Sequence, residues 1–332
     1  MKPTIYDVAK EAGVSIATVS KVINNTGKMR DSTRENVKEA MLRLNYQPSL
    51  MASALTGKGT ETLGLLVPDI SNPFFSEMAR TIEDRAHESG MSVIMCSTDE
   101  NPEKEKKYLE LLQRKQVDGF IVASSFQDKN LLKGLKKLRI PLVMLTQDDI
   151  GLDVTSVSVD DFKGGYEATS HLITAGHRNI AIIAENANSS KMRIYGYREA
   201  HAEHGLICSE ENIFQTTASI TNGKECLKEM VQKENVPTAI FACNDLIAIG
   251  VIQGAKELGL KVPEDLSIVG FDNTILATTT VPALTTVAQP ITEMGNKVVD
   301  VIIEEIKEKN RGKERVLFNP QLIVRGTTTS ID

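Results

Sequence analysis

The sequence has few cysteines and no run of apolar residues long enough to cross a membrane. The four cysteines, at positions 96, 208, 226 and 243, are widely spaced and form no Cys-x-x-Cys pair. We therefore expect reduced thiols, as is usual in the cytosol. No segment approaches the ~20 consecutive apolar residues of a membrane-spanning helix, and the N-terminus lacks an apolar signal region. These absences predict a cytoplasmic protein without a membrane partner, whereas the lack of tryptophan excludes no function.

Motifs of common catalytic chemistry are also missing. The chain contains no Gly-x-x-x-x-Gly-Lys-Ser/Thr loop, no His-Glu-x-x-His and no Gly-x-Ser-x-Gly. Gly57-Lys58-Gly59 lacks the third glycine and the preceding strand of a dinucleotide-binding motif. His201 and His204 share a helical face, but two histidines with no nearby cysteine are far more often surface residues than metal ligands. We expect no enzyme activity, no cofactor and no metal.

The N-terminus, in contrast, has the pattern of a helix-turn-helix. Thr4 and Asp7 have the spacing of a capping box at the start of a first helix, and Gly13 supplies the backbone that ends it. Ser15 then caps a second short helix. Apolar residues follow the helical period in both helices: Ile5, Val8, Ala9 and Ala12, then Val19, Val22 and Ile23. This arrangement places a second helix in the major groove of DNA.

The distribution of charge supports a nucleic-acid partner for this end of the chain. Residues 1–58 carry nine lysines and arginines against five acidic residues, whereas the whole chain has a formal net charge of −6. A basic N-terminus on an acidic body is expected of a protein that binds a polyanion through its N-terminal end alone. An ordinary amphipathic start with solvated charges is the alternative.

The region between this motif and the rest of the chain predicts a third helix and a hinge. Ser32 to Glu35 has the spacing of a second capping box, and Pro48 ends the helix that follows. Residues 49–55 form a helix-prone stretch of about two turns, which is marginal alone in water. We expect it to fold only when something packs against it.

Together these segments resemble the LacI/GalR family of bacterial transcription regulators, and within it the degradation-activator branch of bacilli. The resemblance covers essentially the whole chain, and its strongest elements are residues 5–9, Val14-Ser15, residues 18–20, residues 22–24 and residues 44–48. It implies that three residues read base edges in the major groove: Ile16, Ala17 and Lys21. It also implies phosphate contacts for Thr4, Ser15, Thr18, Ser20 and Asn24. Packing in the core is the alternative for Ile16.

The resemblance further implies a minor-groove hinge formed by Ala52, Ser53 and Leu55. In the family the hinge leucine is wedged into a central base step and kinks the duplex, which favours a flexible pyrimidine–purine step there. Many relatives carry an arginine where this chain has Ser53, so their operator sequences do not transfer directly. A linker leucine without this duty is the alternative for Leu55.

From residue 62 onward, short apolar strands alternate with helical stretches, which indicates parallel sheets buried on both faces. We therefore expect an all-α helix-turn-helix headpiece (1–47), a hinge and linker (48–60) and an α/β body (61–332). The body is too long for a single sheet with helices on its two faces, so we predict two doubly wound parallel-sheet subdomains. The resemblance implies a periplasmic-binding-protein-like body with repeated crossings: residues 61–161 and 291–320 in one subdomain, residues 162–290 and 321–332 in the other.

Ligands of open α/β sheets bind at the carboxyl ends of the strands. This rule selects Asp69, Phe74 and Phe75 after the first body strand, Asn244 and Asp245 after a later one, and Asp272 after another. The resemblance adds Arg193 as an effector anchor, and Asp160 is a further cleft candidate. A surface arginine is the alternative for Arg193, and a cap on the following helix is the alternative for Asp272.

Two departures from the family narrow the choice of partners. Ala187 and Ala218 stand where purine-binding relatives place an arginine and an aromatic residue, which argues against a purine. The segment 289–295 lacks the tyrosine found in relatives that dock a phosphorylated carrier protein, which argues against such a protein as the partner.

We therefore expect a homodimeric regulator, most simply a repressor, whose affinity for a pseudo-palindromic operator is set by a small molecule or partner acting on the body. A cytosolic small-molecule-binding protein without an operator is one alternative, and an enzyme on the same body is another.

Overall fold

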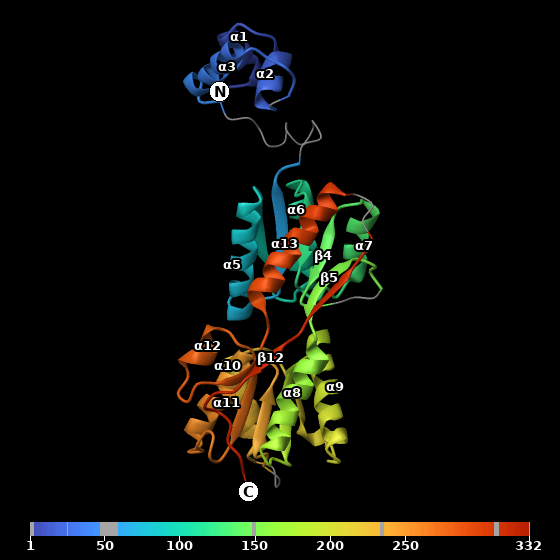
Figure 1. The fold of residues 1–332 in the computed structure, drawn as a ribbon, viewed down its shortest axis with the longest axis vertical. Helices are drawn as coiled ribbons and strands as arrows, with labels where there is room; N and C mark the ends of the chain where they lie inside the picture. The colour runs from blue at the N-terminus through green and yellow to red at the C-terminus, as the bar shows by residue number, and fades with distance from the viewer. Residues whose placement is uncertain are drawn as a thin grey trace.

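The computed structural model describes residues 3–24, 26–46, 59–147, 151–232, 236–308 and 312–331. They form a small helical headpiece and a body of two α/β lobes, with the C-terminus at the end of the second lobe (Figure 1).

The headpiece contains three helices, α1 (Ile5–Ala12), α2 (Ile16–Ile23) and α3 (Asp31–Arg43). Gly13 ends α1 with a left-handed φ of 62°, as predicted. The Asp7 carboxylate accepts hydrogen bonds from the Thr4 backbone N–H (2.8 Å) and hydroxyl (2.7 Å), and Ser15 Oγ accepts from the Thr18 N–H (3.2 Å). The three helices share one small core, made of Val8, Ala9, Ala12, Val19, Val22, Val37 and Ala40.

The predicted start of α3 is wrong. The helix begins at Asp31, with Arg30 as its N-cap and no side-chain cap, so Ser32 lies inside the first turn. An acidic residue in the first turn interacts favourably with the helix dipole, which favours starting the helix at Asp31. The expected hinge helix, with Ala52, Ser53 and Leu55, lies outside the described residues.

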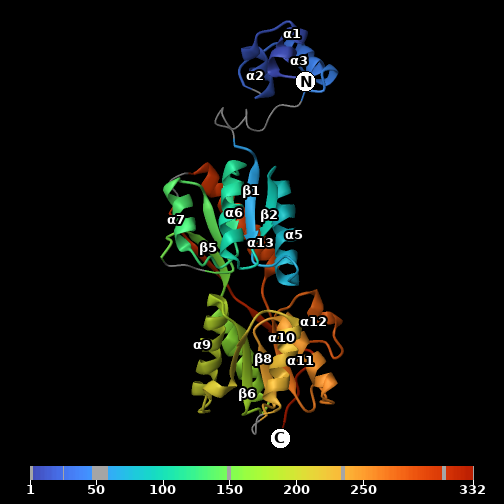
Figure 2. The same cartoon turned by 180° about the vertical axis from the view of Figure 1, so that it is seen from behind.

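The N-lobe is a six-stranded parallel sheet in the order β11-β5-β4-β3-β1-β2. Its strands are β1 (Thr62–Val67), β2 (Ser92–Ser97), β3 (Gly119–Val122), β4 (Leu142–Leu145), β5 (Thr155–Val159) and β11 (Arg315–Phe318). One face is covered by α5 (Pro73–Glu88) and α13 (Ile291–Lys307), the other by α6 (Pro102–Arg114) and α7 (Lys129–Lys137) (Figures 1 and 2).

The C-lobe repeats this plan with the order β12-β10-β9-β8-β6-β7. Its strands are β6 (Ile180–Glu185), β7 (Ile213–Thr216), β8 (Ala239–Ala242), β9 (Ser267–Asp272), β10 (Thr285–Ala288) and β12 (Gln321–Ile323). On one face lie α8 (Asp161–Thr174) and α9 (Asn188–Glu203), and on the other α10 (Ile220–Met230) and α11 (Asp245–Glu257). A 3-10 turn η1 (Glu210–Asn212) and a short helix α12 (Ile275–Thr279) complete the lobe.

The chain passes between the lobes three times, after β5, after β10 and after β11. Three edge strands, β7, β11 and β12, are too short or too polar to have been predicted, and β12 runs antiparallel to β10 rather than parallel. The two-lobed parallel architecture is confirmed. None of the described helices is both long and apolar enough to span a bilayer.

Candidate functional site

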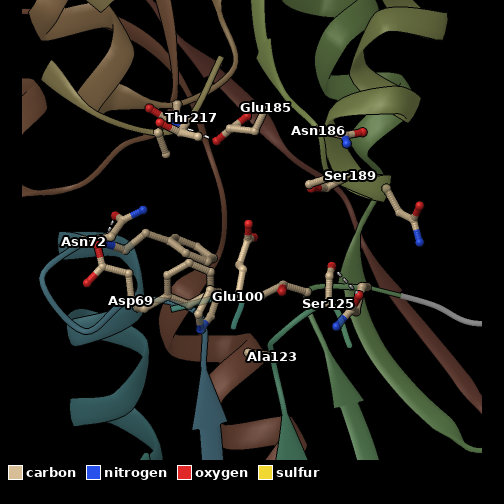
Figure 3. Close-up of a pocket in the computed structure, with 18 of the residues that line it drawn as sticks. Asp69, Asn72, Glu100, Ala123, Ser125, Glu185, Asn186, Ser189 and Thr217 are labelled. Carbon is tan, nitrogen blue, oxygen red and sulfur yellow. Dashed lines mark hydrogen bonds between the residues drawn. The ribbon is translucent and has the colours of Figure 1, made fainter. Parts of the chain in front are cut away.

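A cavity of about 600 Å³ lies between the two lobes. Residues that follow the carboxyl ends of strands in both sheets line it, so each lobe supplies one wall (Figure 3). Among the predicted residues, the cavity brings together Asp69, Phe74, Phe75, Arg193, Asn244 and Asp272. A volume of this size suits a small ligand.

The start of α5 supplies the aromatic part of the N-lobe wall. Asn72 caps this helix, since its side-chain oxygen accepts from the Phe74 backbone N–H (3.0 Å), and Pro73 occupies the first turn. The rings of Phe74 and Phe75 meet edge to face with centroids 5.0 Å apart. Phe74 is buried and supports Phe75, which is half-buried and is therefore the ring available to a ligand.

Arg193 enters the cavity from α9 and is not the surface arginine that was the alternative, because only 6% of it is exposed. Its Nε and Nη2 atoms both lie 2.8 Å from Asp161 Oδ1, and it donates to the Cys243 carbonyl. The guanidinium sits 3.6 Å from the centre of the Phe271 ring. Burial lowers the pKa of Arg193, but the charges of Asp161 and Asp272 outweigh it, so the group stays cationic.

Asp272 ends β9 and is almost fully buried. Burial raises the pKa of this carboxyl well above its usual value, although the charge of Arg193 opposes the shift. Its Oδ1 accepts from the Gln289 amide at 2.7 Å. Asp272 has a φ of 113°, rare for a residue with a side chain. The alternative role as a helix cap is wrong, because Thr274 is the N-cap of α12.

Two expected cleft residues do not line the cavity. Asp160 caps α8 by accepting from the Lys163 N–H (2.9 Å). Asp245 turns into the C-lobe, where it accepts from the Thr274 N–H and hydroxyl and from the Thr286 hydroxyl at 2.7–2.9 Å. Asp245 is the first residue of α11, whereas its neighbour Asn244 is the N-cap of that helix and lines the cavity.

Several polar lining residues were missed by the sequence reasoning. They end or follow the strands β2, β3, β4, β6 and β7: Asp99, Glu100, Ser125, Thr146, Gln147, Glu185, Asn186, Asn188, Ser189, Thr216 and Thr217. The strand-end rule selects the residues at β2, β3, β4 and β6 as well, because the sequence predicts these strands, but it could not select Thr216 and Thr217, because β7 is not predicted. Ala187 and Ala218, which argued against a purine, also line the cavity.

In the headpiece, the face of α2 opposite its core is open to solvent. Ile16 is 41% exposed, and Ala17 and Lys21 are exposed as well. Core packing, the alternative for Ile16, is therefore wrong. Of the predicted phosphate contacts, Thr4 and Ser15 are exposed, while Thr18, Ser20 and Asn24 are half-buried along the same helix. The Ser15 and Thr18 hydroxyls are 2.9 Å apart, and Asn24 Nδ2 donates to Ser20 Oγ at 3.3 Å.

The described residues contain no group of three or more histidines, cysteines or carboxylates placed to hold a metal ion. His201 is buried rather than on the surface, with its ring packed on Tyr197, so that expectation is wrong for His201. His204 is exposed. All four cysteines are free thiols.

A helix-turn-helix headpiece with an exposed second helix, on a body that encloses a polar cavity, defines a ligand-responsive DNA-binding regulator. One family model, for bacterial regulatory proteins of the lacI family, matches residues 4–49. Another, for periplasmic binding proteins and the sugar binding domain of the LacI family, matches residues 60–325. The chain belongs to the LacI family, and it is a transcription regulator with an effector-binding body rather than an enzyme.

Individual relatives agree with this assignment. The chain is 46% identical to the HTH-type transcriptional regulator DegA of Bacillus subtilis, with 100% of both sequences covered, in line with the branch predicted from the sequence. Its fold is similar to that of a Lac repressor dimer bound to operator and the anti-inducer ONPF (TM-score 0.87, 28% identity, 99% and 100% of the chains). It is also similar to a complex of the transcriptional regulator CelR with cellobiose (TM-score 0.76, 28% identity, 98% and 99%).

Proposed function

We propose that the chain binds a pseudo-palindromic DNA operator as a homodimer, and that a small polar molecule between the lobes sets its affinity for that operator. The observation that carries this proposal is the pairing of an exposed α2 face with a ligand-sized cavity in one chain. The full-length likeness to an operator-bound repressor dimer supports both parts.

In the complex, α2 lies in the major groove. Lys21 donates to guanine acceptors, while Ile16 and Ala17 offer apolar contact to thymine methyl groups. The hydroxyl and amide groups of Thr4, Ser15, Thr18, Ser20 and Asn24 bind phosphates and fix the register without reading sequence. Ala52, Ser53 and Leu55 form the hinge, where Leu55 enters the minor groove at the centre of the operator.

Dimerisation is expected because one headpiece contacts too few base pairs to recognise an operator. Three base-reading side chains on one short helix give too little discrimination, and two half-sites related by a twofold axis double it. The operator must then share that symmetry.

The cavity couples the ligand to the DNA because its two walls belong to different lobes. A ligand that contacts both walls favours the closed arrangement over the open one, and only this difference in affinity can shift the equilibrium. The half-buried ring of Phe75 and the polar strand ends suit a hydroxylated ligand such as a sugar. The cellobiose complex of a relative with the same fold supports this class.

Selection of genomic DNA fragments by the purified full chain tests the proposal. We expect a recovered palindrome centred on a pyrimidine–purine step, bound far more tightly than random DNA by fluorescence anisotropy. A variant with Lys21→Ala and Leu55→Ala should lose this specific binding while its body keeps the wild-type melting temperature. If the variant still binds the recovered site tightly and specifically, this assignment of the DNA-reading residues is wrong.

Binding that shows no motif and fades uniformly with salt would instead favour the second candidate, a small-molecule-binding protein without an operator. That candidate shares the cavity and differs only in what the headpiece does.

A further inference from the structure

The charge of the cavity wall restricts the ligand that it can hold. Five carboxylate side chains line the cavity, Asp69, Asp99, Glu100, Glu185 and Asp272, whereas Arg193 is the one cationic side chain among the described lining residues. Arg193 is already paired with Asp161 and lies against the Phe271 ring. A ligand carrying phosphate or carboxylate would therefore meet excess negative charge and no uncommitted cation.

The five carboxylates differ in what holds them. Asp99 pairs with Lys104 outside the cavity, Asp69 accepts from the backbone and hydroxyl of Ser71 at 2.8 Å, and Asp272 is buried against Gln289. These three carboxylates already have partners in the protein.

Glu100 and Glu185 are different, because neither forms an ion pair with any residue that the structure describes. The Glu185 carboxylate accepts only from neutral groups, the Asn244 amide and the Ser190 hydroxyl (2.5 Å). The Glu100 carboxylate accepts no hydrogen bond from the described residues, and its side chain stands free in the cavity.

These two carboxylates belong to opposite walls. Glu100 follows β2 in the N-lobe, and Glu185 ends β6 in the C-lobe. Figure 3 shows Glu100 rising from the N-lobe wall toward the C-lobe, where Glu185 lies on the facing wall. Partial burial of the Glu100 carboxyl, and then the charge of Glu185, raise the pKa of Glu100. The charges of the two groups therefore repel each other between the lobes.

We propose that the effector is a small hydroxylated molecule that carries a protonated amine, with its ammonium group between Glu100 and Glu185 and its apolar face on the Phe75 ring. This inference rests on the proposed function and specifies the ligand class of the same cavity. An ammonium group has three donors and no acceptor, so it satisfies both carboxylates where a hydroxyl donates to only one. Amino sugars belong to this class.

Such a ligand also explains how binding would close the body. Without it, two like charges face each other from different lobes, which favours separation. The ammonium group replaces this repulsion with two charge-assisted hydrogen bonds, one to each lobe. The ligand therefore binds the closed arrangement more tightly than the open one, as a conformational effector must.

Titration calorimetry of the full chain at neutral pH tests the inference with matched sets of ligands. The probes are glucosamine, galactosamine and mannosamine, each with its neutral parent sugar and its 6-phosphate. At least one amine should bind roughly tenfold or more tightly than its parent, since hydrogen bonds to charged groups contribute that much. Glu100→Gln and Glu185→Gln should each remove most of this preference. Glu264→Gln, at an exposed position outside the cavity, should leave it unchanged.

The inference is overturned if no amine binds more tightly than its parent sugar, if a phosphorylated sugar binds best, or if the preference survives in both glutamine variants. A neutral sugar that binds and alters operator affinity would overturn only this inference and leave the proposed function standing. Failure to recover a specific operator would remove the proposed function whatever the charge of the ligand.

Discussion

Arg193 and Asp161 form a buried ion pair in the C-lobe wall of the cavity, and their side chains are 7% and 9% exposed. Burial raises the pKa of Asp161, although the charge of Arg193 opposes this shift. The attraction between the two charges therefore offsets the cost of removing them from water, and either charge buried without its partner would be strongly unfavourable.

Removing one partner of this pair should destabilise the protein. Arg193→Met leaves the Asp161 carboxylate buried without its partner, and we expect a loss of about 3–5 kcal/mol in the free energy of unfolding at neutral pH. Urea denaturation measures it. The double variant Arg193→Met with Asp161→Asn should recover most of the loss, and a double variant as unstable as the single one would contradict this account of the pair.

Glu100→Gln should stabilise the ligand-free protein at neutral pH. The folded-state pKa of Glu100 is raised above its ordinary value of 4.5, so its ionised form costs folding free energy above that raised pKa. As the pH falls, the folded protein binds the proton first and the cost diminishes, until it is absent below about 4.5. The difference in melting temperature between variant and wild type should therefore shrink as the pH is lowered from 7.5 to 4. A variant that is less stable at pH 7.5, or a difference independent of pH, would show that Glu100 is not disfavoured in its charged form.

At the scale of elements, close approach between α8 and α9 positions the Arg193 backbone. A Cβ atom built on Gly165 would lie 2.2 Å from the Arg193 carbonyl oxygen, and one on Gly196 would lie 2.1 Å from the Phe162 carbonyl oxygen. Neither helix can therefore carry a larger residue at its crossing point without separating the pair.

Gly165→Ala should cost about 1–3 kcal/mol in the free energy of unfolding, the usual cost of overpacking, and should weaken ligand binding because α9 carries Arg193. Gly134→Ala on α7 is the matched control, since a Cβ there meets nothing within 4 Å. Helix propensity alone predicts that this control is stabilised by up to about 1 kcal/mol. Urea denaturation of both variants measures the two changes in the free energy of unfolding. Equal changes at the two positions would contradict the packing argument.

Elements also show what the sequence could and could not predict. The apolar runs that became β1, β3 and β8 were recognisable because strands buried on both faces are continuously apolar. The edge strand β11 was not, because its side chains alternate between exposed and half-buried. The prediction for Asp245 was wrong because the adjacent residues Asn244 and Asp245 point in different directions. The start of the following helix decides which of the two faces the cavity, and the strand pattern alone does not show this.

At the scale of the whole molecule, a hydrogen bond joins the two lobes beside the cavity. The backbone N–H of Ile275, at the start of α12 in the C-lobe, donates to the Glu77 carboxylate on α5 of the N-lobe (2.9 Å). This contact forms only while the lobes lie close together, so it favours the closed arrangement.

Glu77→Ala should shift the ligand-free protein toward the open arrangement. A net contribution of about 1 kcal/mol for one hydrogen bond corresponds to a change of roughly fivefold in the ratio of closed to open molecules. Small-angle X-ray scattering should show a larger radius of gyration than for Glu83→Ala, whose carboxylate pairs with Arg80 within the same helix. Identical scattering from the two variants would mean that this contact does not hold the lobes together.

The central claim is that two copies of α2 read two halves of one operator. It is tested most directly by anisotropy titration of the full chain against the recovered operator and against the same duplex with one half-site scrambled, at several salt concentrations. The account predicts much tighter binding to the intact palindrome at every salt concentration, with a stoichiometry of two chains per duplex. Equal affinity for both duplexes, or one chain per intact operator, would contradict it.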